Sequence, residues 1–305
     1  MVPRSLVGVV AAVALVATAC GPSPGGEGSP PGALATDRGR ARRGAVVVAA
    51  GDIACGGSPC DSHRRTARLI GRIGPDAVLT LGDNQYPDGE YRDFLASYDP
   101  TWGRFLRITR PTPGNHDYHV AGAAGYFRYF GERAHRRRGG YYSFDLGGWH
   151  FLALNSGRGG ISREQLAWVR RNLERDDHRC ELAYWHHPRW SSGSVHGSNT
   201  AYGPLWEVLY RKGVDVVLNG HEHNYERFAP LDPRGRRDPR GIRQFVVGTG
   251  GISHYPLGRP LDGSQVRIDD RFGVLRLAVS AGRYRWAFVA VGGRVLDRGR
   301  DDCHR

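Results

Sequence analysis

Short runs of apolar residues alternate with longer amphipathic stretches along most of the chain. The short runs are rich in β-branched residues, which predicts buried strands at 45–50, 76–81, 180–185 and 214–219. A hairpin over 141–147 and 149–155 and later strands at 242–248, 272–279 and 284–291 are also expected. The amphipathic stretches predict helices at 62–73, 162–175 and 200–212. Helix-bearing units early in the chain and strand-only units later predict an α/β layered sandwich, with helices outside the sheets.

The composition is that of an ordinary globular protein. Its 305 residues are enough for one large domain or two small ones, and 40% apolar with 24% charged residues exclude a wholly disordered chain. The 44 glycines and 18 prolines indicate many loops, but they follow no Gly-X-Y period, which excludes collagen. The sequence has no repeat of the length found in solenoids or propellers.

The formal net charge of +13 comes almost entirely from arginine, because Lys212 is the only lysine. A positive field attracts anions, so phosphorylated substrates, nucleic acid and acidic polymers all stay open as partners. Apart from runs near 136–138 and 234–240, the arginines are scattered along the chain. This favours a solvated surface over a nucleic-acid-binding stripe, and no nucleic-acid-binding motif accompanies the charge.

The amino terminus has the pattern of an export signal. Arg4 is followed by a short apolar run, too short for a membrane span, that ends in small residues before Cys20. We predict a signal peptide over 1–19 and a flexible tether, rich in Pro, Gly and Ser, over 20–43. The segment ending in Cys20 resembles a bacterial lipoprotein cleavage site, which implies an extracytoplasmic protein whose membrane contact is a lipid anchor on Cys20. Simple cleavage near Ala19, giving a secreted protein, is the alternative.

Four further cysteines remain, and an even number in an exported protein suggests disulfides. Cys55 and Cys60 lie in one short loop and can meet easily, which would leave Cys180 to pair with Cys303. Zinc binding is the alternative, but the spacings match no zinc module.

Several strand-like runs end in polar side chains of the metal-ligand type. Ligands in such sheets lie beyond the carboxyl ends of the strands, so loops there can bring these groups together. The candidates offer oxygen and imidazole and no thiolate: Asp52, Asp83, Tyr86, Asn115, His186, His221 and His223. Seven groups exceed the needs of one tetrahedral zinc and suit two first-row metals with a shared carboxylate. Such a pair, about 3.5–4 Å apart, can clamp a phosphate and create a hydroxide nucleophile.

The order of these motifs resembles that of the calcineurin-like metallophosphoesterases and, within that superfamily, of the purple acid phosphatases. The resemblance covers about 46–251 and rests on five motifs: Gly51-Asp52, Gly82-Asp83-Asn84-Gln85-Tyr86, Gly114-Asn115-His116-Asp117, Ala183-Tyr184-Trp185-His186 and Gly220-His221-Glu222-His223. It implies two mixed β-sheets flanked by helices, with 44–305 as the catalytic domain. Ala54 and Ala183 depart from the family pattern, but neither is a ligand.

The resemblance also implies how the ligands divide. Most of the wider superfamily has a metal-binding histidine where this chain has Ala54, and Tyr86 would fill that gap as a phenolate. A phenolate favours Fe(III), so metal one would be Fe(III) held by Asp52, Asp83, Tyr86 and His223. Metal two would be Zn, Mn or Fe(II), held by Asn115, His186, His221 and the bridging Asp83.

The resemblance says less about the residues that contact the substrate than about the metal ligands. By resemblance, His116 contacts the phosphoryl group or the leaving oxygen, with Asp117 orienting its ring, and His196 is a further candidate in the loop after His186. His187 is interpreted as a packing or supporting residue. The stretch Tyr225-Glu226-Arg227 is interpreted as structural, and the glycine-rich stretch 248–251 could lie at the rim of the site as a phosphate cradle.

The sequence therefore predicts hydrolysis of phosphate monoesters on small molecules, with a metal-bound hydroxide attacking phosphorus in line. A phosphodiesterase or nucleotidase of the same fold is the alternative within the enzyme class, because fold and ligands do not separate these activities. A surface binding module with a vestigial site is the alternative from a different class.

Overall fold

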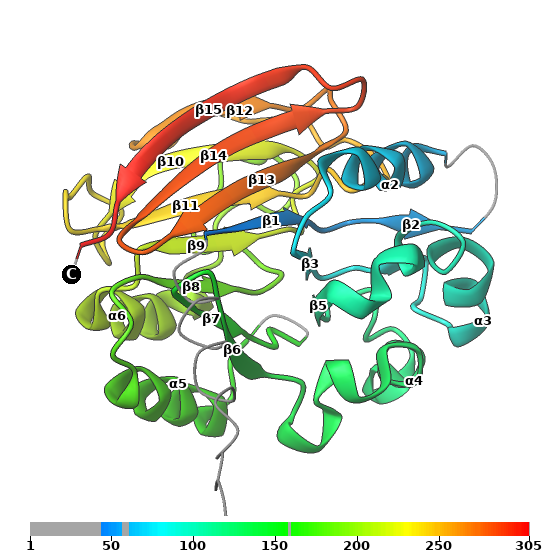
Figure 1. Cartoon of the computed structure of the whole chain (residues 1–305), viewed down its shortest axis with the longest axis horizontal. Coiled ribbons are helices and arrows are strands. Elements are labelled where there is room, and N and C mark those ends of the chain that lie inside the picture. Colours follow the sequence, from blue (N-terminus) through cyan, green and yellow to red (C-terminus); the bar gives the residue numbers. More distant parts are fainter. Residues whose placement is uncertain (1–43, 57–60, 158–159, 305) are drawn as a thin grey trace, which may run out of the picture.

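The computed structural model describes residues 44–56, 61–157 and 160–304, and it consists of two stacked β-sheets with helices outside them (Figure 1). One sheet has six strands in the order β15-β14-β13-β1-β3-β5. Their bounds are β1 (Ala45–Ala50), β3 (Ala77–Leu81), β5 (Thr109–Thr112), β13 (Gly273–Ser280), β14 (Arg283–Ala290) and β15 (Val295–Asp302). This arrangement confirms the predicted layered α/β sandwich.

The other sheet has seven strands in the order β12-β10-β11-β9-β8-β7-β6. Their bounds are β6 (Tyr142–Leu146), β7 (Trp149–Ala153), β8 (Glu181–Tyr184), β9 (Val216–Asn219), β10 (Tyr225–Leu231), β11 (Ile242–Val247) and β12 (Ser264–Ile268). A short pair, β2 (Ala54–Cys55) with β4 (Gln85–Tyr86), joins the loops at one edge.

Both large sheets are mixed. Strands β1, β3 and β5 run parallel, and so do β7, β8, β9 and β11, while the remaining pairs are antiparallel. Because parallel strands place their carboxyl ends at one edge, the loops after β1, β3, β8 and β9 can meet there.

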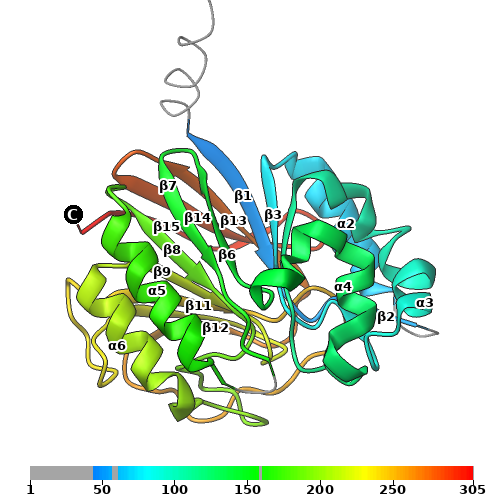
Figure 2. The same ribbon diagram turned by 90° about the horizontal axis from the view of Figure 1, so that it is seen from below.

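Helices cover the outer faces of the sandwich (Figure 2). Helices α5 (Arg163–Arg175) and α6 (Gly203–Lys212) pack on the seven-stranded sheet through a core that includes Val169, Leu173 and Trp206. The six-stranded sheet is flanked by α2 (Ser62–Ile73), α3 (Tyr91–Asp93) and α4 (Ala124–Phe130). Within the described ranges, no helix combines the length and the apolar character needed to cross a bilayer.

The predicted helices and strands agree with the structure to within one or two residues, except that 200–212 begins with a 3-10 turn before α6. Helices α3 and α4 were not predicted, and neither were strands β2, β4, β5, β10, β12 and β15. The last two are the outermost strands of their sheets, and their sequences, SQVRI and VLDRGRDD, are largely polar. An edge strand buries little apolar surface, so hydrophobic periodicity gives a weak signal for it.

Cys180 and Cys303 form a disulfide, with Cα atoms 5.5 Å apart, which confirms that predicted pair. The bond ties the last described segment to the residue before β8. Cys60, the predicted partner of Cys55, lies outside the described residues. The predicted signal peptide (1–19) and tether (20–43), with Cys20, lie outside them as well.

Candidate metal centre

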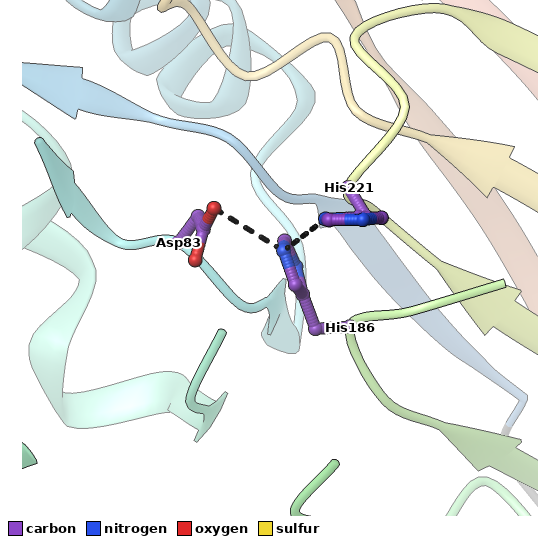
Figure 3. A group of neighbouring side chains, drawn as sticks. All are labelled: Asp83, His186 and His221. Carbon is purple, nitrogen blue, oxygen red and sulfur yellow. Dashed lines mark hydrogen bonds and ion pairs between the residues drawn. The ribbon is translucent and has the colours of Figure 1, made fainter. Parts of the chain in front are cut away.

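The seven predicted ligands lie together at the carboxyl edge of the two sheets. Asp52 follows β1, Asp83 follows β3, Asn115 follows β5, His186 follows β8, and His221 and His223 follow β9, while Tyr86 belongs to β4. Figure 3 shows three of them, Asp83, His186 and His221, pointing toward one another from separate strand ends. One ligand atom from each of these three lies within 4.8 Å of the others. We refer to these seven residues as the rim site.

One half of the rim site is built around the ring of His186. Its Nε2 lies 3.2 Å from Asp83 Oδ2, 3.1 Å from Asn115 Oδ1 and 3.2 Å from His221 Nδ1. Its Nδ1 donates a hydrogen bond of 2.8 Å to the carbonyl of Leu81, which leaves a lone pair on Nε2 in the neutral ring. Four atoms with lone pairs thus face one small space, an arrangement that a bound cation stabilises.

The other half surrounds the hydroxyl of Tyr86. It lies 2.9 Å from Asp83 Oδ2 and 3.0 Å from Asp52 Oδ1, so its single proton is donated to one carboxylate at a time, and it lies 3.2 Å from His223 Nε2. The other ring nitrogen of His223 is 2.7 Å from Ser253 Oγ. Asp83 Oδ2 is therefore shared by both halves, which is the position that a bridging ligand occupies.

The backbone at the rim site is strained where the ligands begin. Asp52, Asp83 and His221 have φ values of 61°, 47° and 72°, and each follows a glycine. Left-handed backbone at non-glycine residues costs free energy and is concentrated at functional sites. Gly114 must be glycine for a steric reason, because a Cβ there would clash with Asp83 Oδ1.

Burial and neighbouring charges set the ionisation of the rim site. Burial opposes charge on His186, but Asp83 outweighs it and raises the pKa of His186 to about 9. Burial likewise opposes charge on Asp83, and His186 overcomes it and lowers the pKa of Asp83. Burial, followed by Asp52 and Asp83, raises the pKa of the Tyr86 phenol well above its usual value. A cation between these groups would reverse that field and favour the phenolate.

These observations show that the donor set fits two metal ions. The groups are oxygen and imidazole donors, the Leu81 carbonyl fixes the tautomer of the neutral His186 ring, and one carboxylate oxygen touches both halves. Such a set suits first-row metals.

His116 lies at the mouth of the rim site. Its Nε2 is 4.0 Å from Asp83 Oδ2, its side chain is 27% exposed, and its ring packs against Tyr86 with centroids 4.1 Å apart. Its Nδ1 is 2.5 Å from the carbonyl of Pro87, which fixes the ring with Nε2 toward the centre. The described geometry thus leaves one ring nitrogen of His116 for chemistry.

The predicted role of Asp117 in orienting that ring is wrong. Asp117 is fully buried, and its carboxylate accepts hydrogen bonds from Gly114 N (2.9 Å) and from both nitrogens of Asn84. The carboxylate turns inward because these loop donors need an acceptor, and the Pro87 carbonyl orients His116 instead. Burial, followed by the charge of Asp83, raises the pKa of Asp117 to about 7.

The ring of His196 stacks on His221 with centroids 4.1 Å apart, so the structure places this candidate at the rim. Its position depends on Glu222, a buried residue that the sequence reasoning missed. Glu222 Oε1 accepts hydrogen bonds from the backbone N–H groups of His196 (2.8 Å) and Gly197. The position of Glu222 between the ligands His221 and His223 was the signal available for it.

Other residues around the rim site support it. His187 is buried, hydrogen-bonds Ser156 Oγ at 2.9 Å and packs against His221, in keeping with its interpretation as a supporting residue. Tyr255 stacks on His223 with centroids 3.7 Å apart, and no sequence pattern marked this residue.

The glycine-rich stretch 248–251 is a packing element and not a phosphate cradle. The N–H groups of Gly248 and Gly250 donate to the carbonyls of Asn224 and Gly51, so both are committed inside the protein. Glu226 is structural, as interpreted, because it accepts hydrogen bonds from Ser192 and Ser264.

A cluster of oxygen and imidazole side chains at the carboxyl edge of a two-sheet α/β sandwich is the arrangement that the motifs of a metallophosphoesterase predict. The family model described as calcineurin-like phosphoesterase matches residues 45–225. The chain belongs to the calcineurin-like phosphoesterase family.

Curated relatives of the chain are named as purple acid phosphatases or as acid phosphatases. Purple acid phosphatase 15 of Arabidopsis thaliana is 30% identical over 214 residues, covering 58% of this chain and 40% of the relative. Acid phosphatase type 7 of Homo sapiens is 26% identical over 257 residues, covering 68% of this chain and 56% of the relative. The chain thus spans about half the length of the curated relatives it matches.

Two solved structures share the fold. Purple acid phosphatase PPD1 from yellow lupin (Lupinus luteus) seeds superposes with a TM-score of 0.71 at 20% identity, covering 85% of this chain and 54% of that one. GAP50 of Plasmodium superposes with a TM-score of 0.62 at 14% identity, covering 87% of this chain and 90% of that one.

Proposed function

We propose that this chain hydrolyses phosphate monoesters at a dinuclear metal centre formed by the rim site. The observation that carries the proposal is the position of Asp83 Oδ2, which lies 2.9 Å from Tyr86 OH and 3.2 Å from His186 Nε2. In this assignment Asp52, Tyr86 and His223 hold an Fe(III) ion. Asn115, His186 and His221 hold Zn, Mn or Fe(II), and Asp83 bridges the two.

When bound, the two cations supply Lewis-acid stabilisation of the phosphoryl oxygens and acidify a water to provide the nucleophile. His116 holds a proton at Nε2 and donates it to the leaving oxygen, while the Pro87 carbonyl fixes its ring through Nδ1. The partly exposed position of His116 supports this role, because the leaving group must depart toward solvent.

His196 contacts the substrate on the opposite side of the site, beside His221. The net charge of +13 favours anionic small molecules such as phosphate monoesters through long-range attraction. The names of the curated relatives, acid phosphatases, support the monoester assignment.

The test combines metal analysis with two chromogenic substrates. Purified protein covering residues 44–305 should contain two metal ions per chain and hydrolyse p-nitrophenyl phosphate faster than bis(p-nitrophenyl) phosphate. Faster hydrolysis of the diester would assign the chain to the phosphodiesterases. Protein that binds no metal and hydrolyses neither ester would be a binding module, and the proposed function would be wrong.

We also propose an extracytoplasmic location. The Cys180–Cys303 disulfide supports it, because such bonds persist in oxidising compartments. A Cys20→Ser variant tests the proposed lipid anchor: it should be released from the membrane or remain unprocessed, and unchanged membrane association would contradict the anchor.

A further inference from the structure

A second group of histidines and aspartates lies near the starts of β7 and β8, and β8 is one of the strands that lead to the rim site. Asp145 in β6 is paired across the hairpin with His150 in β7. Asp176 and His178 lie in the loop between α5 and β8. We call these four residues the amino-end cluster, because they surround the starts of β7 and β8.

The ligand-type atoms of the cluster are close together. One such atom from each of Asp145, His150 and His178 lies within 4.8 Å of the others. His150 Nδ1 is 2.6 Å from Asp145 Oδ1 and 3.6 Å from Asp176 Oδ1, while His178 Nδ1 is 2.6 Å from Asp176 Oδ1. Ligand-type atoms of Asp145, His150 and His178 therefore converge from two strands and a loop, and Asp176 Oδ1 lies beside both imidazoles.

The ring of His150 is held from behind as in a metal ligand. Its Nε2 is 2.7 Å from Asn172 Oδ1, and the amide nitrogen of Asn172 donates to Ser143 Oγ at 3.0 Å. The Nε2–H group therefore donates to Asn172, so the neutral ring points the Nδ1 lone pair at the two carboxylates. The Nδ1 lone pair of His150 and the carboxylate oxygens of Asp145 and Asp176 repel one another unless a proton or a cation lies between them.

The cluster also carries excess negative charge in a buried place. The side chain of Asp176 is 6% exposed, and its carboxyl group is hydrogen-bonded to the side chains of His178 and Glu181. Glu181, which is paired with His150 across β7 and β8 and is 1% exposed, brings a third carboxyl to the cluster. Three carboxyl groups beside two imidazoles leave an excess of acidic groups, which favours a cation among them.

We propose that the amino-end cluster binds one divalent first-row cation such as zinc through Asp145, His150, Asp176 and His178. Two imidazoles and two carboxylates form a set that tetrahedral zinc accepts. The exposed fractions of Asp145 (58%) and His178 (27%) leave a path from solvent. Ligand atoms around zinc are about 3.3 Å apart, so the two 2.6 Å contacts must open slightly, which the exposed side chain of Asp145 and the partly exposed side chain of His178 permit.

The bound cation would fasten the β6–β7 hairpin to the loop that leads from α5 into β8. The Cys180–Cys303 disulfide anchors the same loop two residues after His178. The cluster lies at the far ends of the strands from the rim site, so this metal has a structural role that does not depend on the proposed hydrolysis.

The test measures zinc bound per chain by mass spectrometry after loading with zinc alone and desalting. His178→Ala and Asp145→Asn should each bind one zinc fewer than the wild type and keep the wild-type rate of ester hydrolysis. The matched controls His135→Ala and Asp262→Asn alter residues outside both sites and should keep the wild-type zinc content. Asn172→Ala, which removes only the group behind His150, should weaken the zinc site by roughly 10–100-fold.

An Asp83→Asn background separates this proposal from the proposed function. Adding His178→Ala to Asp83→Asn should remove one further zinc, whatever metal the rim site retains. Equal zinc content with and without His178→Ala, in both backgrounds, would mean that protons alone bridge the His–Asp pairs, and the metal site would be rejected. Because Asp145 is exposed, its variant gives the same answer even if His178→Ala folds poorly.

Discussion

The rim site and the amino-end cluster both contain histidines and aspartates and lie near opposite ends of β8, but they differ in preorganisation. At the rim, three residues have left-handed backbone, glycines admit close backbone approach, and ligand atoms of Asp83, Asn115 and His221 all lie within 3.2 Å of His186 Nε2. At the amino ends, the histidines and aspartates already satisfy one another in hydrogen-bonded pairs, and Asp145 is more than half exposed.

The difference indicates what each arrangement is built to do. Backbone strain and closely spaced ligand atoms are tolerated at a site where a bound cation stabilises them and a reaction depends on them. The hydrogen-bonded His–Asp pairs of the amino-end cluster can exist without a metal. They should bind a metal ion more weakly than the rim site does, because the bridging protons must leave first. A cluster of histidine and aspartate is therefore not enough to define a catalytic site.

The largest expected effect follows from changing the shared ligand. Asp83→Asn should reduce hydrolysis of p-nitrophenyl phosphate by at least about 10³-fold and remove metal from the rim site, because one oxygen serves both halves. Metal analysis and steady-state kinetics measure both effects. A variant that retained both metals and most activity would break the distinction between the two clusters.

His116→Ala should lower kcat by roughly 10²–10⁴-fold while both rim metals stay bound, because His116 donates a proton and is not a ligand. Kinetics together with metal analysis test this, with His119→Ala, the neighbouring exposed histidine, as the matched control. Loss of metal as complete as in Asp83→Asn would show that His116 is a ligand.

Tyr86→Phe should bleach the iron-loaded protein. A phenolate bound to Fe(III) absorbs visible light by charge transfer, so the wild type is expected to be violet or pink. The amino-end cluster contains no phenol, so it cannot contribute such a band. An absorption spectrum that is unchanged in Tyr86→Phe, or iron-loaded wild type without a visible band, would contradict the assignment of Tyr86 as a ligand.

Glu222→Ala should raise KM by about tenfold with rim metals retained. The variant loses the acceptor that holds the backbone of His196 and Gly197, and two hydrogen bonds of about 1 kcal/mol each correspond to an effect of at least that size. Glu207→Ala, on the exposed face of α6, is the control. An unchanged KM would mean that the His196 loop is positioned by other contacts.

The smallest effect concerns His63, a buried histidine outside both sites. Burial, followed by the charge of Arg64, lowers its pKa to about 4, whereas carboxylates raise the pKa of His186. Between pH 4 and 6.5 the unfolded chain binds this proton and the folded protein does not, so stability falls as the pH falls.

His63→Phe should remove this contribution, at most about 1.4 kcal/mol per pH unit, from the free energy of unfolding. Urea denaturation at pH 7.0, 5.5 and 4.5 measures it, with His119→Phe as the control. The same pH dependence in the His63→Phe variant and the wild type would show that His63 is charged in the folded protein.

The sequence could predict those parts of the fold that carry strong local signals. Buried strands such as β1 and β9 have continuous apolar runs, and α5 has an apolar face, so each was located closely. Edge strands β12 and β15 could not be located, because half of each strand faces solvent and its partner supplies the hydrogen bonds.

The sequence by itself determined the family motifs, the strand ends that carry them and the candidate ligands, because each depends on residues close together in the chain. Only the tertiary structure decided that Pro87 and not Asp117 holds the ring of His116, and that Glu222 positions the His196 loop. It alone placed Asp145 and His150 beside Asp176 and His178. The physical reason is that such contacts depend on which loops the packing of distant strands brings together, and hydrogen-bond partners between distant segments leave no periodic trace in the sequence.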